Sequence, residues 1–266
     1  MKSGTVSVSW QEYRHGWNQV DAEVIEETML TVYVNAVEIG TMMASPRDQI
    51  QLALGFLKNE GIIENLYEVR EAYISKKGCC VDIWLDHPVI KPNKKIITSG
   101  CGGGFTYNDL TSIAQPVQEG IYISPTQLSR LFNKLQAPDS LYSRARGVHA
   151  AAISSGETLL AVAEDVGRHN AVDKLVGMCM LAKIETQGLI LLTTGRISSE
   201  MLRKGAAMGC PIIASRNSPT SMSVEMAKTW NITLVGYVRK GTLRAYTHPE
   251  RLQKTEPASL VPLAGD

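Results

Sequence analysis

The sequence lacks any apolar run that approaches the roughly 18 residues of a membrane-spanning helix. Its first 16 residues also lack the apolar core of a secretion signal. The protein is therefore expected to be soluble and cytoplasmic. Charge of one sign is equally scarce, because the formal net charge is +1 and Lys and Arg form no long runs. Nonspecific binding to nucleic acid or to an anionic membrane is not expected, so any anion site must be local.

Several cysteine and glycine motifs are missing as well. There is no C-x-x-C pair, and no histidine lies near a cysteine in the sequence, so the spacing predicts no zinc site. The cysteines are odd in number and irregularly spaced, which argues against a secreted disulfide framework; they are Cys79, Cys80, Cys101, Cys179 and Cys210. No GxxxxGK[ST] segment is present, which disfavours a P-loop nucleotidase.

At 266 residues, 44% of them hydrophobic, the chain has enough material for two domains with separate cores. We predict domains over 17–118 and 119–253, followed by a flexible tail over 254–266. In the first, 26–44 has the pattern of two strands around an Asn-containing turn, and Ser45 and Pro46 predict the start of a helix that ends near Gly61. Strands expected over 67–75 and 80–85 complete a small α+β unit.

The second domain alternates between strand and helix patterns. A helix is predicted to begin at Ser124 and Pro125. Strands are expected over 148–153, 159–163, 189–193, 211–214 and 232–237, and helices over 169–181, 199–208 and 219–229. Such alternation is typical of an α/β fold with a largely parallel sheet covered on both faces.

Three loops that follow predicted strands of this domain combine a cation with glycine or a hydroxyl group. Ligands of open α/β sheets bind beyond the carboxyl ends of the strands, where helix N-termini favour anions. A single such loop is more often a solvated helix cap. Three such loops at one edge of the sheet favour a binding site whose ligand is a phosphate-rich nucleotide. The candidate ligand residues are Arg196, Arg216, Tyr237, Val238, Arg239, Lys240, Gly241 and Thr242.

The densest polar cluster covers 163–174, where a strand leads through a glycine turn into a helix. The candidates for a polar rim around a ligand, able to shift a neighbouring thiol toward thiolate, are Glu164, Asp165, Arg168 and His169. The structural alternative is a capped helix in which His169 is oriented by Asp173, four residues further on the same face.

Cys101 lies in the run Gly100-Cys101-Gly102-Gly103-Gly104. Glycines without a Cβ allow unusual backbone angles and close approach to a ligand, so this loop has the character of one that delivers a thiol. A glycine-rich turn with an incidental cysteine is the alternative.

Together these segments resemble the FdhD/NarQ family, the formate dehydrogenase accessory sulfurtransferases. The resemblance covers nearly the whole chain, and the run from Glu164 to Lys174 is its most specific part. It also rests on the segments 42–46, 53–56, 60–63, 100–102, 149–151, 234–237 and 246–249.

The resemblance implies a three-layer, cytidine deaminase-like C-terminal domain and a smaller N-terminal α+β domain. It implies that persulfide sulfur from a cysteine desulfurase is taken up on Cys101. The sulfur then passes to the molybdenum cofactor, bis(molybdopterin guanine dinucleotide), before that cofactor is inserted into formate dehydrogenase. The cofactor-binding segment of the family matches 237–242, and a homodimer is implied.

The chain departs from its relatives at two points. Many family members have a second cysteine where this chain has Gly104, so Cys101 must act alone. The H-x-E position of deaminases is His149-Ala150-Ala151 here, and no PCxxC is present, which argues against zinc-dependent deamination. A cofactor-binding chaperone without a covalent sulfur step, or an unrelated nucleotide-binding enzyme, are the alternative functions.

Overall fold

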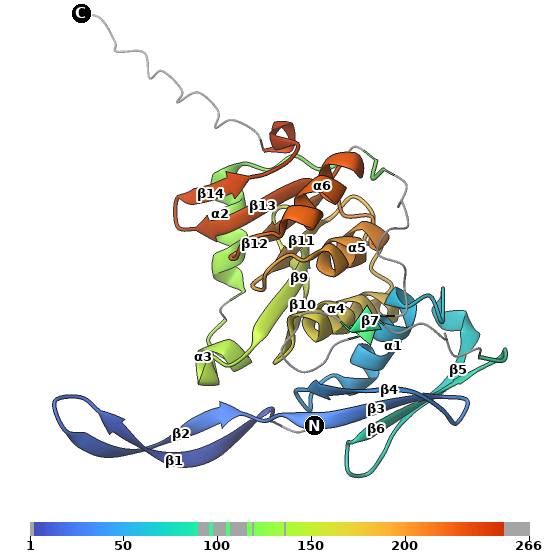
Figure 1. The fold of residues 1–266 in the computed structure, drawn as a ribbon, viewed down its shortest axis with the longest axis vertical. Helices are drawn as coiled ribbons and strands as arrows, with labels where there is room; N and C mark the ends of the chain where they lie inside the picture. The colour runs from blue at the N-terminus through green and yellow to red at the C-terminus, as the bar shows by residue number, and fades with distance from the viewer. Residues whose placement is uncertain are drawn as a thin grey trace, which may run out of the picture.

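The computed structural model describes residues 3–89, 96–97, 105–106, 116–118, 120–135 and 137–252. Two sheets dominate it, one of four strands and one of six (Figure 1). The helices α6, α5, α4 and α1 lie one below another in Figure 1, and the four-stranded sheet lies beneath α1. Cys101 and the expected tail over 254–266 lie outside the described residues.

The four-stranded sheet has the order β4-β3-β6-β5. Its strands are β3 (Thr28–Val34), β4 (Val37–Ala44), β5 (Val69–Ile74) and β6 (Cys80–Leu85), which confirms the strands expected in this region. Asn35 and Ala36, both with positive φ, form the predicted turn between β3 and β4. The helix α1 (Gln49–Asn59) contributes its apolar face to the core of this unit, and a 3-10 turn, η1 (Leu66–Glu68), precedes β5.

The predicted start of the first helix is wrong. The helix begins at Gln49 rather than at Pro46, and Asp48, in a left-handed conformation, precedes it. Ser45 caps no helix: its hydroxyl accepts a hydrogen bond from Val166 N, and its own N–H donates to Asp165. A serine–proline pair resembles a helix start locally, but contacts with a segment 120 residues away determine its conformation.

The six-stranded sheet has the order β10-β9-β11-β12-β13-β14. Its strands are β9 (His149–Ser154), β10 (Leu159–Asp165), β11 (Ile190–Thr193), β12 (Ile212–Ser215), β13 (Thr233–Arg239) and β14 (Thr242–Ala245). Three of them, β11, β12 and β13, are mutually parallel, whereas β9, β10 and β14 run antiparallel to their neighbours. The prediction of a largely parallel sheet is therefore wrong at both edges. Short connections join β9 to β10 and β13 to β14, and such connections can close only hairpins.

Helices cover both faces of this sheet. One face packs against α4 (Arg168–Ala182), α5 (Ser199–Ala207) and α6 (Ser221–Thr229), and the other against α2 (Pro125–Lys134). Alternate residues of β11 separate accordingly, with Leu191 facing α4 and α5 while Ile190 and Leu192 face α2. Ser124 caps α2 as predicted, through a capping box with Gln127. The short helix α3 (Leu141–Ala145) and the 3-10 turn η2 (Pro249–Arg251) complete this part.

The two sheets are joined through α1 and α4, which cross at two glycines. A Cβ on Gly55 would lie 1.8 Å from the carbonyl oxygen of Asp173, and one on Gly177 would lie 2.0 Å from that of Gln51. The backbones of the two helices therefore touch, and no other residue fits at either position. This contact sets the position of the small sheet relative to α4.

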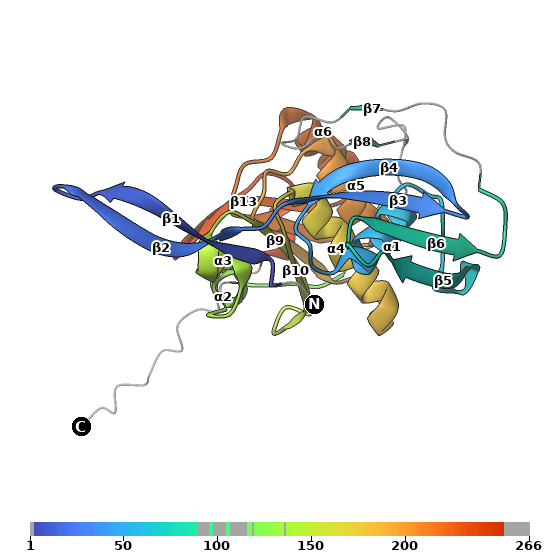
Figure 2. The ribbon, with the colours of Figure 1, turned by 90° about the horizontal axis from the view of Figure 1, so that it is seen from below.

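Two further pairs of strands stand apart from these sheets. A long ribbon of β1 (Thr5–Tyr13) and β2 (Trp17–Ile25) projects from the body, which the sequence did not predict (Figures 1 and 2). A short pair, β7 (Ile96–Ile97) and β8 (Phe105–Thr106), flanks the segment that contains Cys101. In both views this pair lies on the side of the molecule that carries β4 and α5.

Candidate functional site

The carboxyl ends of β11, β12 and β13 meet at one edge of the large sheet, as the sequence predicts for its three cationic loops. The amino-terminal end of the antiparallel strand β9 lies at the same edge. A cavity of about 320 Å³ opens there. It is lined by Leu135, Tyr142, Val148, His149, Ala150, Thr194, Arg216, Asn217 and Arg239. Two of the predicted cations, Arg216 and Arg239, thus line one cavity.

Arg216 is the more enclosed of these cations. Its Nη2 donates to the carbonyl oxygen of Phe132 at 3.0 Å, and its guanidinium lies over the Phe132 ring, 5.9 Å from the centroid. Burial, and secondly the nearby charge of Arg239, lower the pKa of Arg216. Its Nε is buried without a hydrogen-bond partner among the described residues. A half-buried guanidinium with an unused donor next to a second cation is suited to an anionic ligand.

The segment over 237–242 forms the tip of the β13–β14 hairpin. Arg239 and Lys240 are exposed there, and Gly241, at φ 78°, makes the turn. Arg244 stacks on the ring of Tyr237 at 4.2 Å. Val238 is 1% exposed and packs under α2, so its side chain faces the core and only its backbone is open to a ligand. Thr242 is exposed, whereas the exposed Arg196 lies in the loop after β11 and does not line the cavity.

His149, Thr194 and Asn217 line this cavity but were not predicted as ligand groups. The Nδ1 atom of His149 lies 3.5 Å from Thr194 Oγ1. Burial, and then the charge of Arg168, lower the pKa of His149, so the ring is neutral at pH 7. Asn217 donates from its amide to the carbonyl oxygen of Thr194. In the sequence, His149 stands at the start of a predicted strand. The start of β9 lies at the edge with the cavity only because β9 runs antiparallel to β11, which the sequence did not predict.

Asp165, predicted as a ligand residue, is fully buried. Its Oδ2 accepts hydrogen bonds from Ser45 N at 3.0 Å and from Lys174 Nζ at 2.7 Å. Its Oδ1 accepts from Gly167 N and from the Asn170 side chain. These four bonds use the acceptor positions of the carboxylate to hold the end of β4 against the start of α4. Lys174, also fully buried, extends the same network to the carbonyl oxygens of Ser45 and Glu164.

His169, another predicted residue of this cluster, forms no hydrogen bond or ion pair with Asp173 among the described residues. Its Nε2 lies 3.4 Å from Glu200 Oε2 of α5. Asp173 instead binds Lys204 Nζ at 2.7 Å and the Asn59 side chain at 2.6 Å. The alternative in which Asp173 orients His169 is therefore wrong, because a lysine of α5 takes that carboxylate.

Burial disfavours the charged form of both members of the His169–Glu200 pair. It lowers the pKa of His169 to about 2, helped by the charges of Lys204 and Arg168, and it raises the pKa of Glu200. Arg168 lies close by, with its side chain packed against Gly195, where a Cβ would lie 2.7 Å from that of Arg168. Arg168 and His169 thus sit at the junction of α4 and α5, and neither lines the cavity at the sheet edge.

Because His169 stays neutral in the fold, the protein is expected to lose stability as the pH falls below 6.5. The unfolded chain takes up a proton at this residue and the folded chain does not, which lowers the free energy of unfolding by about 2 kcal/mol between pH 7 and pH 5. His169→Gln should remove this increment. Urea unfolding of the wild type and the variant at pH 7 and pH 5 measures this difference in the free energy of unfolding. An equal loss of stability in the two proteins would contradict the assignment of the pH dependence to His169.

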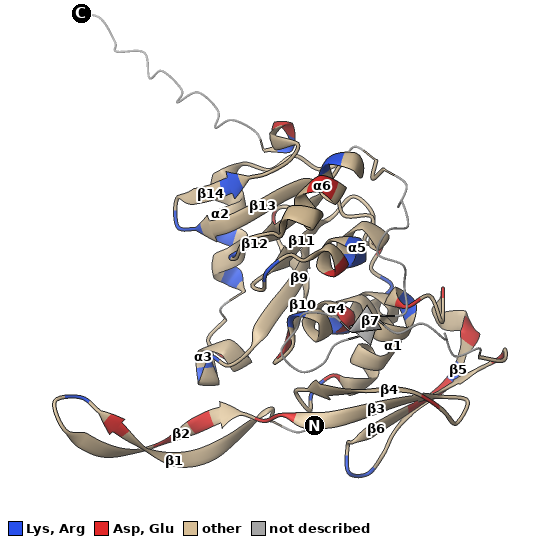
Figure 3. Cartoon of the chain, in the orientation of Figure 1, with Lys and Arg blue, Asp and Glu red and all other residues tan. Residues whose placement is uncertain are grey.

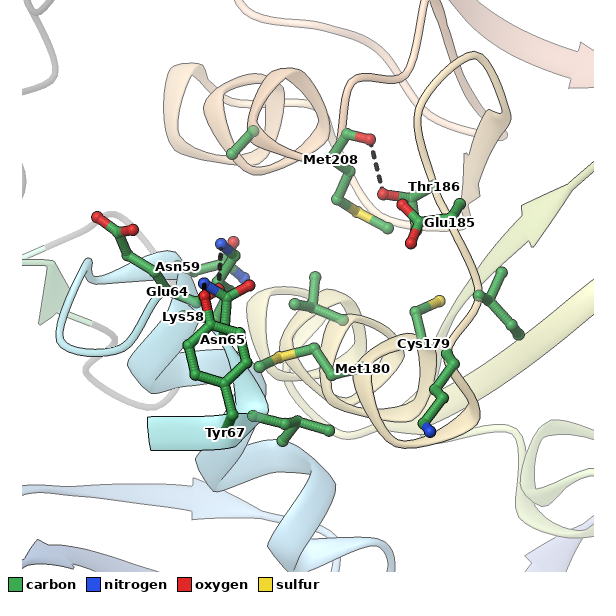
Figure 4. A pocket seen from close by; sticks show the side chains of 15 residues that line it. Lys58, Asn59, Glu64, Asn65, Tyr67, Cys179, Met180, Glu185, Thr186 and Met208 are labelled. Atoms are coloured by element: carbon green, nitrogen blue, oxygen red, sulfur yellow. Dashed lines mark hydrogen bonds between the residues drawn. The ribbon is translucent and has the colours of Figure 1, made fainter. Parts of the chain in front are cut away.

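Another cavity, of about 420 Å³, lies between the C-terminal ends of α1, α4 and α5 (Figure 4). Cys179, Met180 and Met208 contribute sulfur atoms to its wall. Cys179 and Cys210 are buried, and burial raises the pKa of Cys179 to about 11. A thiol held protonated in this way is a poor nucleophile.

Within the described part of the chain, no three His, Cys, Asp or Glu side chains lie close enough together to hold a metal ion. None of the helices among these residues combines the length and the apolarity required to span a bilayer.

Comparison with known proteins adds the decisive observation. Residues 25–253 match the FdhD/NarQ family. The chain belongs to the FdhD/NarQ family. The resemblance stated from its sequence motifs is thereby confirmed, and the match includes both sheets and the segment that contains Cys101.

Individual relatives agree with this membership. The sulfur carrier protein FdhD of Staphylococcus haemolyticus is 35% identical over 244 residues, which cover 90% of this chain and 92% of that protein. FdhD of Bacillus subtilis is 34% identical over 251 residues, covering 92% and 96%. Among solved structures, a formate dehydrogenase accessory protein from Desulfotalea psychrophila superposes with a TM-score of 0.78 at 27% identity, covering 94% of this chain and all of that one. The mixed α/β architecture is thus that of the FdhD/NarQ family.

Proposed function

We propose that this protein is a cytoplasmic sulfur carrier that serves formate dehydrogenase. Relatives that align over about nine-tenths of the chain are sulfur carrier proteins, and the matching solved structure is that of a formate dehydrogenase accessory protein. The cytidine deaminase-like character of the large domain, and the division into domains at residue 118, belong to the same proposal. The protein would act as a sulfurtransferase between a cysteine desulfurase and the molybdenum cofactor.

Cys101 is the proposed sulfur-carrying residue. Its thiolate attacks the terminal sulfur of the desulfurase persulfide, so that Cys101 becomes a persulfide and the donor leaves as a thiolate. The carried sulfur then passes to the cofactor, which is the substrate of the second step. Of the other four cysteines, Cys179 and Cys210 are buried with raised pKa values, which leaves them poorly suited to this role.

The observation that supports cofactor binding is the cavity between Arg216 and Arg239 at the sheet edge. The cofactor carries two pyrophosphates, and a half-buried guanidinium with an unpartnered Nε is suited to such an anion. The remaining predicted ligand residues, among them Arg196, Lys240 and Thr242, stay predictions. The buried groups Asp165, Arg168 and His169 would act on the ligand only through the residues around them.

Mass spectrometry tests the sulfur step directly. After incubation with a cysteine desulfurase and cysteine, the peptide that contains Cys101 should gain the mass of one sulfur atom. The proposal fails if no such adduct forms, or if it lies on Cys79 or Cys80 instead.

A cofactor chaperone without a covalent step is the second candidate, and Gly104 favours it because the chain lacks the second cysteine of many relatives. The two candidates share the binding site, so nucleotide binding tests the site without deciding between them. Replacing Arg216 with alanine should weaken binding of a guanine nucleotide about tenfold to hundredfold, since a charge-assisted hydrogen bond is lost.

Isothermal titration measures this effect. Arg130→Ala, which removes an exposed cation of α2 away from the cavity, is the matched control and should leave the affinity nearly unchanged. Equal losses in the two variants would show that the attraction is a general effect of charge.

A further inference from the structure

His149 lies where β9 meets the cavity at the edge of the large sheet. It is the first residue of β9, and its half-buried ring lines the cavity together with Arg216 and Arg239. None of the nine described residues that line this cavity is acidic. In Figure 3 cationic segments gather near the end of β12, on β13 and in the β13–β14 hairpin. The cavity therefore has two fixed positive charges and one imidazole that can add a third.

Hydrogen bonds between neighbouring strands fix the surroundings of the His149 ring. Thr194 N donates to Ala150 O at 3.0 Å, and Ala150 N donates to Thr194 Oγ1 at 2.9 Å. The same hydroxyl oxygen lies 3.5 Å from Nδ1 of His149, at the outer limit of a hydrogen bond. Among the described residues, Nε2 of His149 has no hydrogen-bond partner. This nitrogen is thus the ring atom that remains available to a ligand.

The groups on the protein side of the ring disfavour its protonation in the free protein. Burial, and then the charge of Arg168 in α4, lower the pKa of His149, whereas Asp165 of β10 raises it. Asp165 is the partner of His149 in the β9–β10 ladder, but Lys174 already compensates its charge. His169 of α4, which also interacts with His149, has a pKa of about 2 and brings no charge. The balance on this side is positive.

On the cavity side, His149 shares the wall with Arg216, Arg239 and the phenol of Tyr142 from α3. Burial and the charge of Arg239 lower the pKa of Arg216, so the positive charge already present in the cavity is incompletely compensated. A third positive charge on the imidazole is unfavourable in that field. It becomes favourable once an anion lies among these groups, because an opposite charge a few ångströms away stabilises the imidazolium.

We propose that His149 is a third ligand of the anion in this cavity, neutral in the free protein and protonated in the complex, so that binding takes up a proton. The inference rests on the proposed cofactor site and adds to it a ligand group and a dependence on pH. In the imidazolium both ring nitrogens are donors. Nδ1 then donates to the Thr194 hydroxyl, and Nε2 donates a charge-assisted hydrogen bond to a phosphate oxygen of a pyrophosphate diester.

The direction of the pH effect follows from the linkage between proton and ligand. In the free protein the pKa of His149 is below its ordinary value of 6.5, and a bound anion raises it. Well above both pKa values the ring is neutral with or without ligand, and the affinity does not depend on pH. As the pH falls through the pKa of the complex, the complex gains a proton that the free protein lacks. The affinity therefore rises, by at most about tenfold per pH unit.

Calorimetric titration with GDP-mannose, a guanosine pyrophosphate diester, at pH 8 and pH 6 tests the proposal. A diester is chosen because a terminal phosphate has a second pKa of about 6 and would itself take up a proton. The wild type should bind about fivefold to tenfold more tightly at pH 6 than at pH 8. Near pH 6.5, heats measured in two buffers of different ionisation enthalpy should show the uptake of more than about half a proton per ligand.

His149→Gln retains a hydrogen-bond donor but cannot take up a proton. Its affinity at pH 8 should stay within about threefold of the wild type, whereas the gain at pH 6 and the proton uptake should disappear. The matched control is His87→Gln, because His87 follows β6, bonds to Glu68 and does not line the cavity. This variant should keep both effects. Thermal unfolding at pH 6 and pH 8 shows whether the two variants are folded.

Three results would overturn the proposal. The first is a wild type whose affinity is the same at pH 8 and pH 6, the second is a pH dependence that survives in His149→Gln, and the third is its loss in His87→Gln as well. Binding that requires Arg216 but does not change with pH would leave the cofactor site in place and remove His149 from its ligands. No binding at either pH would overturn the site and, with it, the role of His149.

Discussion

Cys101→Ala is expected to abolish sulfur transfer to the molybdenum cofactor, with a fall in rate of more than about a thousandfold, because no nucleophile remains at that position. Guanine nucleotide binding should stay within about twofold of the wild type, since Arg216 and Arg239 are unchanged. The rate is measured with labelled sulfur supplied by a cysteine desulfurase, and the binding by titration.

The matched controls are Cys79→Ala and Cys80→Ala. These thiols lie 3.7 Å apart beside Ser75, whose hydroxyl lowers the pKa of Cys79, and they are only half-buried, so they are the competitors for sulfur. Transfer should persist in both variants. Loss of transfer in the Cys79 variant together with retention in Cys101→Ala would move the reaction to the β5–β6 turn.

Gly177→Ala is expected to cause a large loss of stability, because Gly177 is one of the two glycines at which the backbones of α1 and α4 touch. Its Cβ would lie 2.0 Å from the carbonyl oxygen of Gln51, and a backbone atom cannot turn aside as a side chain can. Separating α1 from α4 also strains the contacts of Asp173 with Lys204 and Asn59. We expect a loss of at least about 3 kcal/mol, or failure to fold, measured by urea unfolding.

Gly147→Ala is the matched control. A Cβ there would lie closest to the side chain of Ile25, at 3.1 Å, which can shift, and the nearest backbone atom, the carbonyl oxygen of Ala145, is at 3.9 Å, an ordinary contact distance. A loss below about 1 kcal/mol is expected. Similar losses at the two positions would mean that the helix crossing tolerates a methyl group, and that α1 is less rigidly placed than its geometry indicates.

The alternation of strands and helices in the large domain was predictable because each strand or helix has its own characteristic spacing of apolar residues. The strands β11 and β12 are short apolar runs bounded by loops, and α2 has both an apolar stripe and a capping box. Directions of strands were harder to predict. β9 and β10 have the same apolar pattern as parallel strands, and only the short connection between them indicates a hairpin.

The candidate site was predicted in part. That Arg216 and Arg239 lie at one edge followed from the rule for strand ends, and both line the cavity. His149 was missed because a lone histidine on a strand is usually a core residue. Asp165 and His169 come from the same polar run as Arg168, but nothing in that run indicates that β4 and α5 close over them.

Local patterns and motifs were enough to predict most of the strands and helices, to recognise the family, and to propose that Cys101 carries the sulfur. The partners of the polar groups became known only from the folded structure. Ser45 binds Asp165 across 120 residues, Lys204 binds Asp173 where His169 was expected to, and β1 and β2 pair into a ribbon that projects from the body. Each of these depends on distances between segments far apart in the chain, which a local pattern of residues does not encode.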